Sequence, residues 1–252
     1  MRTSRSRTEV EPRRVACLNA MGLPAWSRRP GSVLPGAPAA LREVSAAVQG
    51  VPAEVPAPGA DSDIDIGSLD WDALEARVSG CVGCALHAGR SHTVFGVGSR
   101  KADWLVIGEA PGAEEDRRGE PFVGRAGKLL DAMLLATGRA RSEVYIANVV
   151  KCRPPENRDP RPEEAASCAP YLDRQIALLR PKVILAVGRV AAQRLLDVET
   201  PVGRLRGKVH RHAGSGTPLV VTWHPAYLLR RPEAKAEAWR DLVLAMTVAE
   251  DS

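Results

Sequence analysis

The sequence contains few aromatic residues and no long apolar run, and these absences exclude several classes of protein. No stretch approaches the ~18 to 20 apolar residues that cross a bilayer, and the Arg-rich N-terminus lacks the apolar segment of a secretion signal. The five cysteines are odd in number, and without such a signal they are not expected to form a disulfide framework. We therefore expect a cytoplasmic protein that contacts no membrane.

Two nucleotide-binding fingerprints are also missing. The segment 108–124 follows an apolar run, yet it has neither the G-x-G-x-x-G nor the G-x4-G-K-[ST] spacing. Its first part, residues 108–116, carries four acidic residues that would repel a phosphate: Glu109, Glu114, Glu115 and Asp116. The whole chain nevertheless has a formal net charge of +5 and an isoelectric point near 9.1, which favours a polyanionic partner.

Residues 1–67 differ in composition from the rest of the chain, and we expect them to be a largely disordered extension. Residues 30–67 are rich in Pro, Ala, Gly and Val without an amphipathic period, which is typical of a flexible linker. Residues 15–26 form a short apolar segment that resembles the N-terminal peptide of the psi subunit of the bacterial DNA polymerase III clamp loader. The segment is therefore either a docking site for a replication or repair protein or part of a disordered tail.

Residues 68–252 show the pattern of a folded α/β domain. Four short apolar runs occupy residues 104–107, 144–147, 183–187 and 219–223. Amphipathic segments lie at residues 69–78, 127–137, 162–180, 189–196 and 232–248. Continuous apolar strands that alternate with helices favour a parallel sheet covered on both faces. We expect a three-layer α/β/α fold around a four-stranded, mainly parallel sheet, which would bind ligands at the carboxyl ends of its strands.

Three polar residues follow directly after expected strands. Glu109 follows the first strand, in a position that forms sites in such folds. Asn148 follows the second; its amide matches the edge of a pyrimidine ring, although it could also cap loop backbone. His224 follows the fourth, and Pro225 restricts its backbone, which suits electrophilic or acid–base work.

Four of the five cysteines fall in two pairs, Cys81 with Cys84 and Cys152 with Cys168. The C-x2-C spacing brings two thiols within reach of one metal ion or cluster. The second pair flanks a stretch whose density of prolines, from Pro154 to Pro162, excludes regular secondary structure. Metal or cluster ligation is therefore the expected role of these four residues.

The segments GEAPGAEED, PFVGRAGKLLD, NVVKCRPPENRDPRPEEAASC and HPAYLL, in this order, closely resemble the family 4 uracil-DNA glycosylases, the iron–sulfur branch of the uracil-DNA glycosylase superfamily. The resemblance runs from about Cys81 to Arg240. It implies a 4Fe–4S cluster held by Cys81, Cys84, Cys152 and Cys168. It also implies a monofunctional, monomeric enzyme of base excision repair, which works at the nucleoid, flips uracil out of DNA and hydrolyses its N-glycosidic bond.

The resemblance also assigns roles in uracil binding and catalysis. Phe122 would stack on the flipped uracil and Asn148 would hydrogen-bond its edge, while Ala110 would line the pocket and Glu115 would exclude the methyl group of thymine.

His224 would stabilise the charge that develops on uracil O2. Glu109 would orient the attacking water or stabilise the cationic sugar.

Five further residues are expected to contact DNA. Leu228 and Leu229 would fill the gap left by the flipped base, with Arg230 on a phosphate, or they simply lead into the last helix. The basic segment 204–212, with Arg206 and Lys208, either contacts DNA phosphates or forms a solvated loop.

Two other functions stay open on the residues alone. A non-catalytic DNA-binding module with a cluster or zinc would bind DNA without releasing uracil. A small-nucleotide hydrolase that used the acidic loop and a divalent ion would lose its activity in EDTA.

Overall fold

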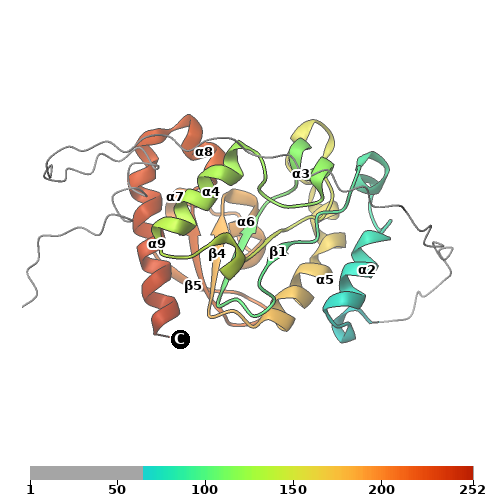
Figure 1. Ribbon diagram of the computed structural model, residues 1–252, viewed down its shortest axis with the longest axis horizontal. Coiled ribbons are helices and arrows are strands. Elements are labelled where there is room, and N and C mark those ends of the chain that lie inside the picture. The colour runs from blue at the N-terminus through green and yellow to red at the C-terminus, as the bar shows by residue number, and fades with distance from the viewer. Residues whose placement is uncertain (1–64, 252) are drawn as a thin grey trace, which may run out of the picture.

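The computed structural model describes residues 65–251, which form three layers with a sheet between two groups of helices (Figure 1). The folded part includes a 3-10 helix at Ile66–Ser68, where Ile66 packs against the core, so it begins slightly before the expected boundary at residue 68. The predicted docking segment at residues 15–26 lies outside the described residues. No helix within residues 65–251 is long and apolar enough to span a bilayer.

The sheet has six strands in the order β1-β3-β2-β4-β6-β5. Its centre consists of four parallel strands at the expected places: β2 (Trp104–Gly108), β3 (Tyr145–Asn148), β4 (Val183–Val187) and β6 (Pro218–Thr222). The expected number of four strands is too low, because β1 (Val97–Gly98) and β5 (Val209–Arg211) pair antiparallel at the two edges. Both edge strands are short and partly exposed, so neither has the continuous apolar run by which the central strands are recognised.

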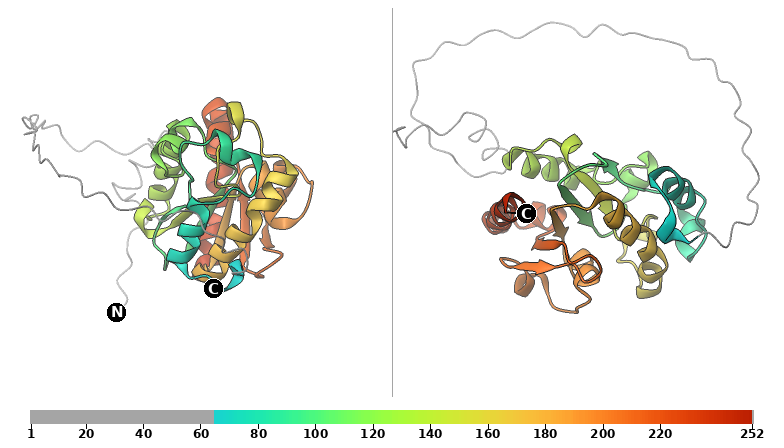
Figure 2. Two further views of the ribbon diagram at one scale, coloured as in Figure 1. Left: turned by 90° about the vertical axis from the view of Figure 1, so that its right-hand side faces the viewer. Right: turned by 90° about the horizontal axis from the view of Figure 1, so that it is seen from below.

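Alternate residues of each central strand enter two separate cores, which explains the three layers. Leu105 and Ile107 of β2 pack under α2 (Trp71–Ser79), α5 (Pro162–Leu179), α6 (Arg189–Leu196) and α7 (Val202–Leu205). Trp104 and Val106 face α4 (Arg125–Ala136), α8 (Pro225–Arg230) and α9 (Lys235–Glu250). Figures 1 and 2 show the two helix layers on opposite faces of the sheet.

Two helices that position functional loops are short. α3 (Ala113–Arg118) follows β2, and α8 follows β6, so both lie at the carboxyl ends of strands, near the top of Figure 1. The final helix begins at Lys235 rather than at Pro232, because Pro232–Ala234 form a 3-10 turn.

The connections from β2 reverse direction within the sheet. The chain passes through α4 on one face to reach β3 on one side of β2, then through α5 on the other face to reach β4 on the opposite side. A crevice forms at such a switch point, outside the carboxyl ends of the strands, and it is the usual ligand site of open α/β sheets. This topology places Glu109, at the end of β2, at the centre of that crevice.

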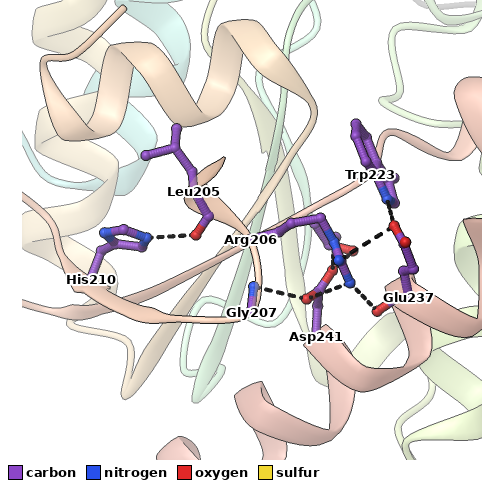
Figure 3. Close-up of polar contacts among 8 residues, drawn as sticks. Leu205, Arg206, Gly207, His210, Trp223, Glu237 and Asp241 are labelled. Atoms are coloured by element: carbon purple, nitrogen blue, oxygen red, sulfur yellow. Dashed lines mark hydrogen bonds and ion pairs between the residues drawn. The ribbon is translucent and has the colours of Figure 1, made fainter. Parts of the chain in front are cut away.

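A buried ionic network ties β6 to α9 and to the segment after α7 (Figure 3). The side chain of Asp241 on α9 is 0% exposed, and it accepts hydrogen bonds from Arg206 Nε (3.1 Å), Gly207 N (3.1 Å) and Thr222 Oγ1 (2.9 Å). Glu237 Oε2 in turn accepts from Trp223 Nε1 at 2.8 Å and lies 3.3 Å from Arg206 Nη1. The guanidinium of Arg206 is therefore committed to two carboxylates inside the fold. This corrects its expected position as a residue turned toward DNA phosphates.

Replacing Asp241 by Ala should lower the free energy of unfolding by about 3 to 5 kcal/mol, because it removes the fully buried carboxylate of the pair and leaves Arg206 only the more exposed Glu237. Urea unfolding followed by circular dichroism measures the change. Asp103→Ala is the matched control, since it removes an exposed carboxylate whose ion pair with Lys182 spans 3.6 Å and should cost about 1 kcal/mol or less. Equal losses in the two variants would contradict the structural role of the network.

Candidate active site

A cavity of about 470 Å³ opens at the carboxyl ends of the parallel strands. It collects side chains from the ends of β2, β3 and β6, from α3, and from the loops that follow. All the residues predicted to bind uracil or to act in catalysis line it: Glu109, Ala110, Glu115, Phe122, Asn148 and His224. The fold thus brings together residues that are up to 115 positions apart in the chain, Glu109 and His224.

The ring of Phe122 is held in place against the end of β2. A Cβ atom on Gly108 would lie 2.5 Å from Phe122 Cζ and 2.5 Å from Asn148 Oδ1, so only glycine allows these two groups to approach the strand. Phe122 itself has a positive φ of 54°, which is unusual for a bulky residue. Arg141 fixes this backbone by donating to the carbonyl oxygens of Pro121 and Phe122.

Asn148 presents an unused hydrogen-bond acceptor. The residue is 2% exposed, and its Oδ1 is buried without a hydrogen-bond partner among the residues that the structure describes. An unpaired buried carbonyl costs ~1 to 3 kcal/mol, so such a group indicates a ligand that supplies the missing donor. The alternative that Asn148 merely caps loop backbone does not account for its unpaired oxygen.

His224 is held as a neutral imidazole with a defined tautomer. The backbone N–H of Ala226 donates to Nδ1 at 3.1 Å, so the single ring proton lies on Nε2, which is free to donate. Burial lowers the pKa of His224 to about 4; the nearby Arg230 lowers it further, while Glu115 opposes the shift. The ring lies 5.6 Å from that of Phe122 at an angle of 30°. His224 is therefore an uncharged donor beside the aromatic platform.

Glu109 is largely buried at the end of β2. Burial raises its pKa to about 7, the adjacent carboxyl of Asp159 raises it further, and Arg189 opposes the shift. A carboxyl group that titrates near neutrality in a crevice is a frequent feature of catalytic sites.

Glu115 has a more structural position than expected. Its Oε1 accepts hydrogen bonds from the backbone N–H groups of Val123 (2.9 Å) and Gly124 (3.0 Å). The carboxylate thereby anchors α3 to the loop that carries Phe122. It lines the cavity at the same time.

The four paired cysteines line a second cavity. Cys81 and Cys84 come from the loop after α2, Cys152 from the segment after β3, and Cys168 from α5. Burial raises the pKa of Cys168 to about 11, and it also raises the pKa of Cys152. No three potential ligands among residues 65–251 converge closely enough to hold a single metal ion.

Comparisons with known proteins agree with this arrangement. A family model described as the uracil DNA glycosylase superfamily matches residues 95–243. The type-4 uracil-DNA glycosylase of Archaeoglobus fulgidus is 46% identical over 172 residues, which cover 66% of this chain and 86% of that protein. The corresponding protein of Pyrobaculum aerophilum is 42% identical over 182 residues, or 70% of this chain and 93% of that protein. The chain belongs to the type-4 uracil-DNA glycosylase family.

A third relative agrees with these two. The type-4 uracil-DNA glycosylase of Thermotoga maritima is 44% identical over 158 residues, or 62% of this chain and 82% of that protein. The family resemblance inferred from the strand-end motifs is thereby confirmed.

The residues expected to contact DNA differ in their surroundings. Arg230 lines the active-site cavity, and Leu229 is 39% exposed beside it. Leu228 is 0% exposed and packs in the core that α8 shares with α4, so it is not available as a wedge in this structure. Lys208 is exposed between α7 and β5. Arg206 is paired internally, as described above.

Two basic residues that line the cysteine cavity were missed in the sequence. Lys151 is 1% exposed, and its Nζ donates to the carbonyl oxygen of Asn148 (2.9 Å) and to Gln175 Oε1 (2.6 Å). Arg90 donates to Cys152 Sγ (3.1 Å) and to the carbonyl oxygen of Cys81 (2.8 Å). Lys151 directly precedes Cys152 in a sequence rich in basic residues, and only its burial distinguishes it from a surface lysine.

Substituting Ala for Gly108 should reduce uracil excision at least tenfold while leaving the fold intact, because the new methyl group displaces both Phe122 and Asn148. Single-turnover cleavage of a uracil-containing oligonucleotide measures the loss. Gly89→Ala is the control, since a Cβ there meets nothing within 4 Å. An unimpaired Gly108→Ala enzyme would show that the position of the ring and amide is unimportant.

Proposed function

We propose that this protein removes uracil from DNA by hydrolysing the N-glycosidic bond, leaving an abasic site for base excision repair. The observation that carries this proposal is the unpaired, buried Oδ1 of Asn148, which faces a cavity also lined by Phe122. The N3–H group of uracil supplies the missing donor. A flipped base would at the same time stack on the aromatic ring.

The chemistry follows from the positions of His224 and Glu109. As the bond between C1′ and N1 breaks, its electron pair passes to uracil and the negative charge spreads onto O2. His224 Nε2–H would donate to that oxygen; the contact of Nδ1 with Ala226 N–H supports this role, since it leaves the proton of the neutral ring on Nε2. Glu109, as a carboxylate, orients the water whose oxygen adds to C1′, and the water's proton leaves through that carboxyl group.

The active site also explains how thymine would be refused. Glu115 and the loop at residues 122–124 are connected by two hydrogen bonds. We propose that this braced segment, with Ala110 on the opposite wall, leaves no space for a methyl group on C5 of the base.

DNA binding is proposed for the exposed members of the predicted set. Arg230 lines the cavity, where it can reach a phosphate that flanks the flipped nucleotide. Leu229 lies next to it on α8. Lys208 directly precedes β5, the edge strand that pairs with β6. A monomeric state, and a replication or repair partner for residues 1–67, stay predictions.

We further propose that Cys81, Cys84, Cys152 and Cys168 hold a 4Fe–4S cluster. Four thiols that line one small cavity are the donor set that a 4Fe–4S cluster takes. The donor set therefore fits the group that the family name implies. When bound, the cluster supplies a cross-link between the loop after α2, the segment after β3, and α5.

The activity itself is tested with oligonucleotides that contain uracil opposite guanine, opposite adenine, or in a single strand. Wild-type protein followed by hot alkali should cleave them, and full activity in EDTA excludes the divalent-ion hydrolase. Binding without uracil release would favour the non-catalytic DNA-binding module instead.

His224→Gln should slow single-turnover excision about a hundred- to thousand-fold, the loss typical of removing one donor from a developing oxyanion. Because the pKa of His224 lies at about 4, its neutral form predominates at every pH above about 5, and the wild-type rate should not fall there through protonation of this group. His210→Gln, outside the cavity on β5, is the matched control and should retain the wild-type rate. A His224→Gln enzyme as active as the wild type would contradict the proposed role of His224 as the donor to uracil O2.

Cys152→Ser should lose iron and the brown colour of the purified protein. Iron analysis and the visible absorption spectrum provide the measurements. Cys17→Ser, which removes the only cysteine outside the proposed set, should keep both iron and colour. A colourless wild-type protein that contains zinc would overturn the assignment of the cluster.

A further inference from the structure

Asp159 is a charged residue at the active site with no role in the mechanism described so far. It belongs to the proline-rich loop between β3 and α5, and it lines the same cavity as Glu109. The Asp159 carboxyl group raises the pKa of the Glu109 carboxyl through its charge and through a side-chain hydrogen bond. Two carboxyl groups so close together cannot both be ionised without repulsion, and a proton shared between them relieves it.

Arg189 forms an ion pair with Asp159. Its Nη2 makes an ion pair with Asp159 Oδ2, and its Nη1 donates to Gln193 Oε1 at 3.3 Å. Arg189 is the first residue of α6, directly after β4, the strand next to β2. The three charged groups therefore span the crevice at the switch point of the sheet, from the end of β2 through the loop to the start of α6.

The other charged groups around the cavity come from three directions. Glu115 lies on α3, Arg158 precedes Asp159 in the loop, and His224 and Arg230 lie at the start and end of α8. Glu115 is occupied by the backbone of residues 123 and 124, and Arg158 is occupied by Glu164 through two hydrogen bonds of 2.8 and 2.7 Å. Asp159 and Arg189 are thus the pair that acts on Glu109.

We propose that Asp159 and Arg189 are positioning residues, which together set the orientation and the protonation state of Glu109. The inference rests on the proposed function, in which the Glu109 carboxylate orients the attacking water. Asp159 fixes one oxygen of Glu109 through the shared proton, and Arg189 limits how far Asp159 can favour the protonated form. Once that proton leaves, Glu109 is the carboxylate that orients the water.

The proposal predicts how the rate depends on pH. Excision needs Glu109 as a carboxylate, so the rate should fall as the pH drops through the pKa of Glu109, which burial raises to about 7. His224, with a pKa of about 4, titrates well below this range. The acidic limb of the rate profile therefore reports on Glu109 alone, and Glu109→Gln should abolish the limb.

The test is the pH profile of single-turnover uracil excision by the full-length, iron-loaded protein and two variants. Asp159→Asn removes the neighbouring negative charge, which should move the acidic limb to lower pH by roughly half a unit or more. Arg189→Gln removes the positive charge, which should move the limb to higher pH. Glu156→Gln in the same loop and Arg194→Gln on α6 are matched controls that should leave the limb in place.

Opposite shifts of the acidic limb in the Asp159→Asn and Arg189→Gln variants would distinguish this role from a merely structural one. If the ion pair only supported the loop, both variants would lower the rate at every pH and leave the limb unmoved, and this result would overturn the proposal. The persistence of the limb in Glu109→Gln would overturn it as well. Wild-type protein that releases no uracil at any pH would instead refute the proposed function itself, so the two failures are distinguishable.

Discussion

The buried ammonium group of Lys151 connects the parts of the fold on which function depends. Its hydrogen bonds to the Asn148 carbonyl oxygen and to Gln175 tie the end of β3 to α5. Gln175 continues the chain of contacts, because its Nε2 donates to the carbonyl oxygen of Phe95 at 3.0 Å. The backbone N–H of Lys151 also approaches Cys168 Sγ at 3.3 Å. One side chain and its backbone thus join the main chain of Asn148 to the cysteine cavity.

This arrangement gives the proline-rich segment after β3 a defined mechanical role. Asn148 lies at one end of it, Cys152 follows four residues later, and Asp159 lies about halfway between Asn148 and Cys168. Burial lowers the pKa of Lys151 to about 8. The two oxygen atoms that accept from Nζ stabilise the buried ammonium form. The proposed cluster would fix both ends of a loop whose middle supplies Asp159 to the active site. In this proposal the cysteines support the chemistry through geometry, while the proposed reacting groups line the other cavity.

Much of the fold and of the site could be predicted because the decisive residues lie at strand ends. The central strands are continuous apolar runs, and the ends of three of the four supply residues of the cavity: Glu109 after β2, Asn148 at the end of β3 and His224 after β6. The edge strands, Lys151 and the pairing of Asp159 with Arg189 could not be predicted, since each depends on burial or on contacts between distant segments. Leu228 and Arg206 were assigned to DNA on local composition. In the structure Leu228 packs against α4 and Arg206 pairs with Asp241, so neither side chain is turned toward solvent.

The backbone of Phe122 places stability and activity in opposition at one position. A bulky residue in the left-handed region costs about 1 to 3 kcal/mol, and the surrounding structure must maintain that conformation. Two neighbours maintain it. The guanidinium of Arg141 donates to the Phe122 carbonyl oxygen, and Gly127 packs so closely that a Cβ there would lie 1.8 Å from the same oxygen. Glycine at position 122 would relax the backbone and remove the ring at the same time. Selection for a more stable protein and selection for a working base pocket therefore demand different residues there.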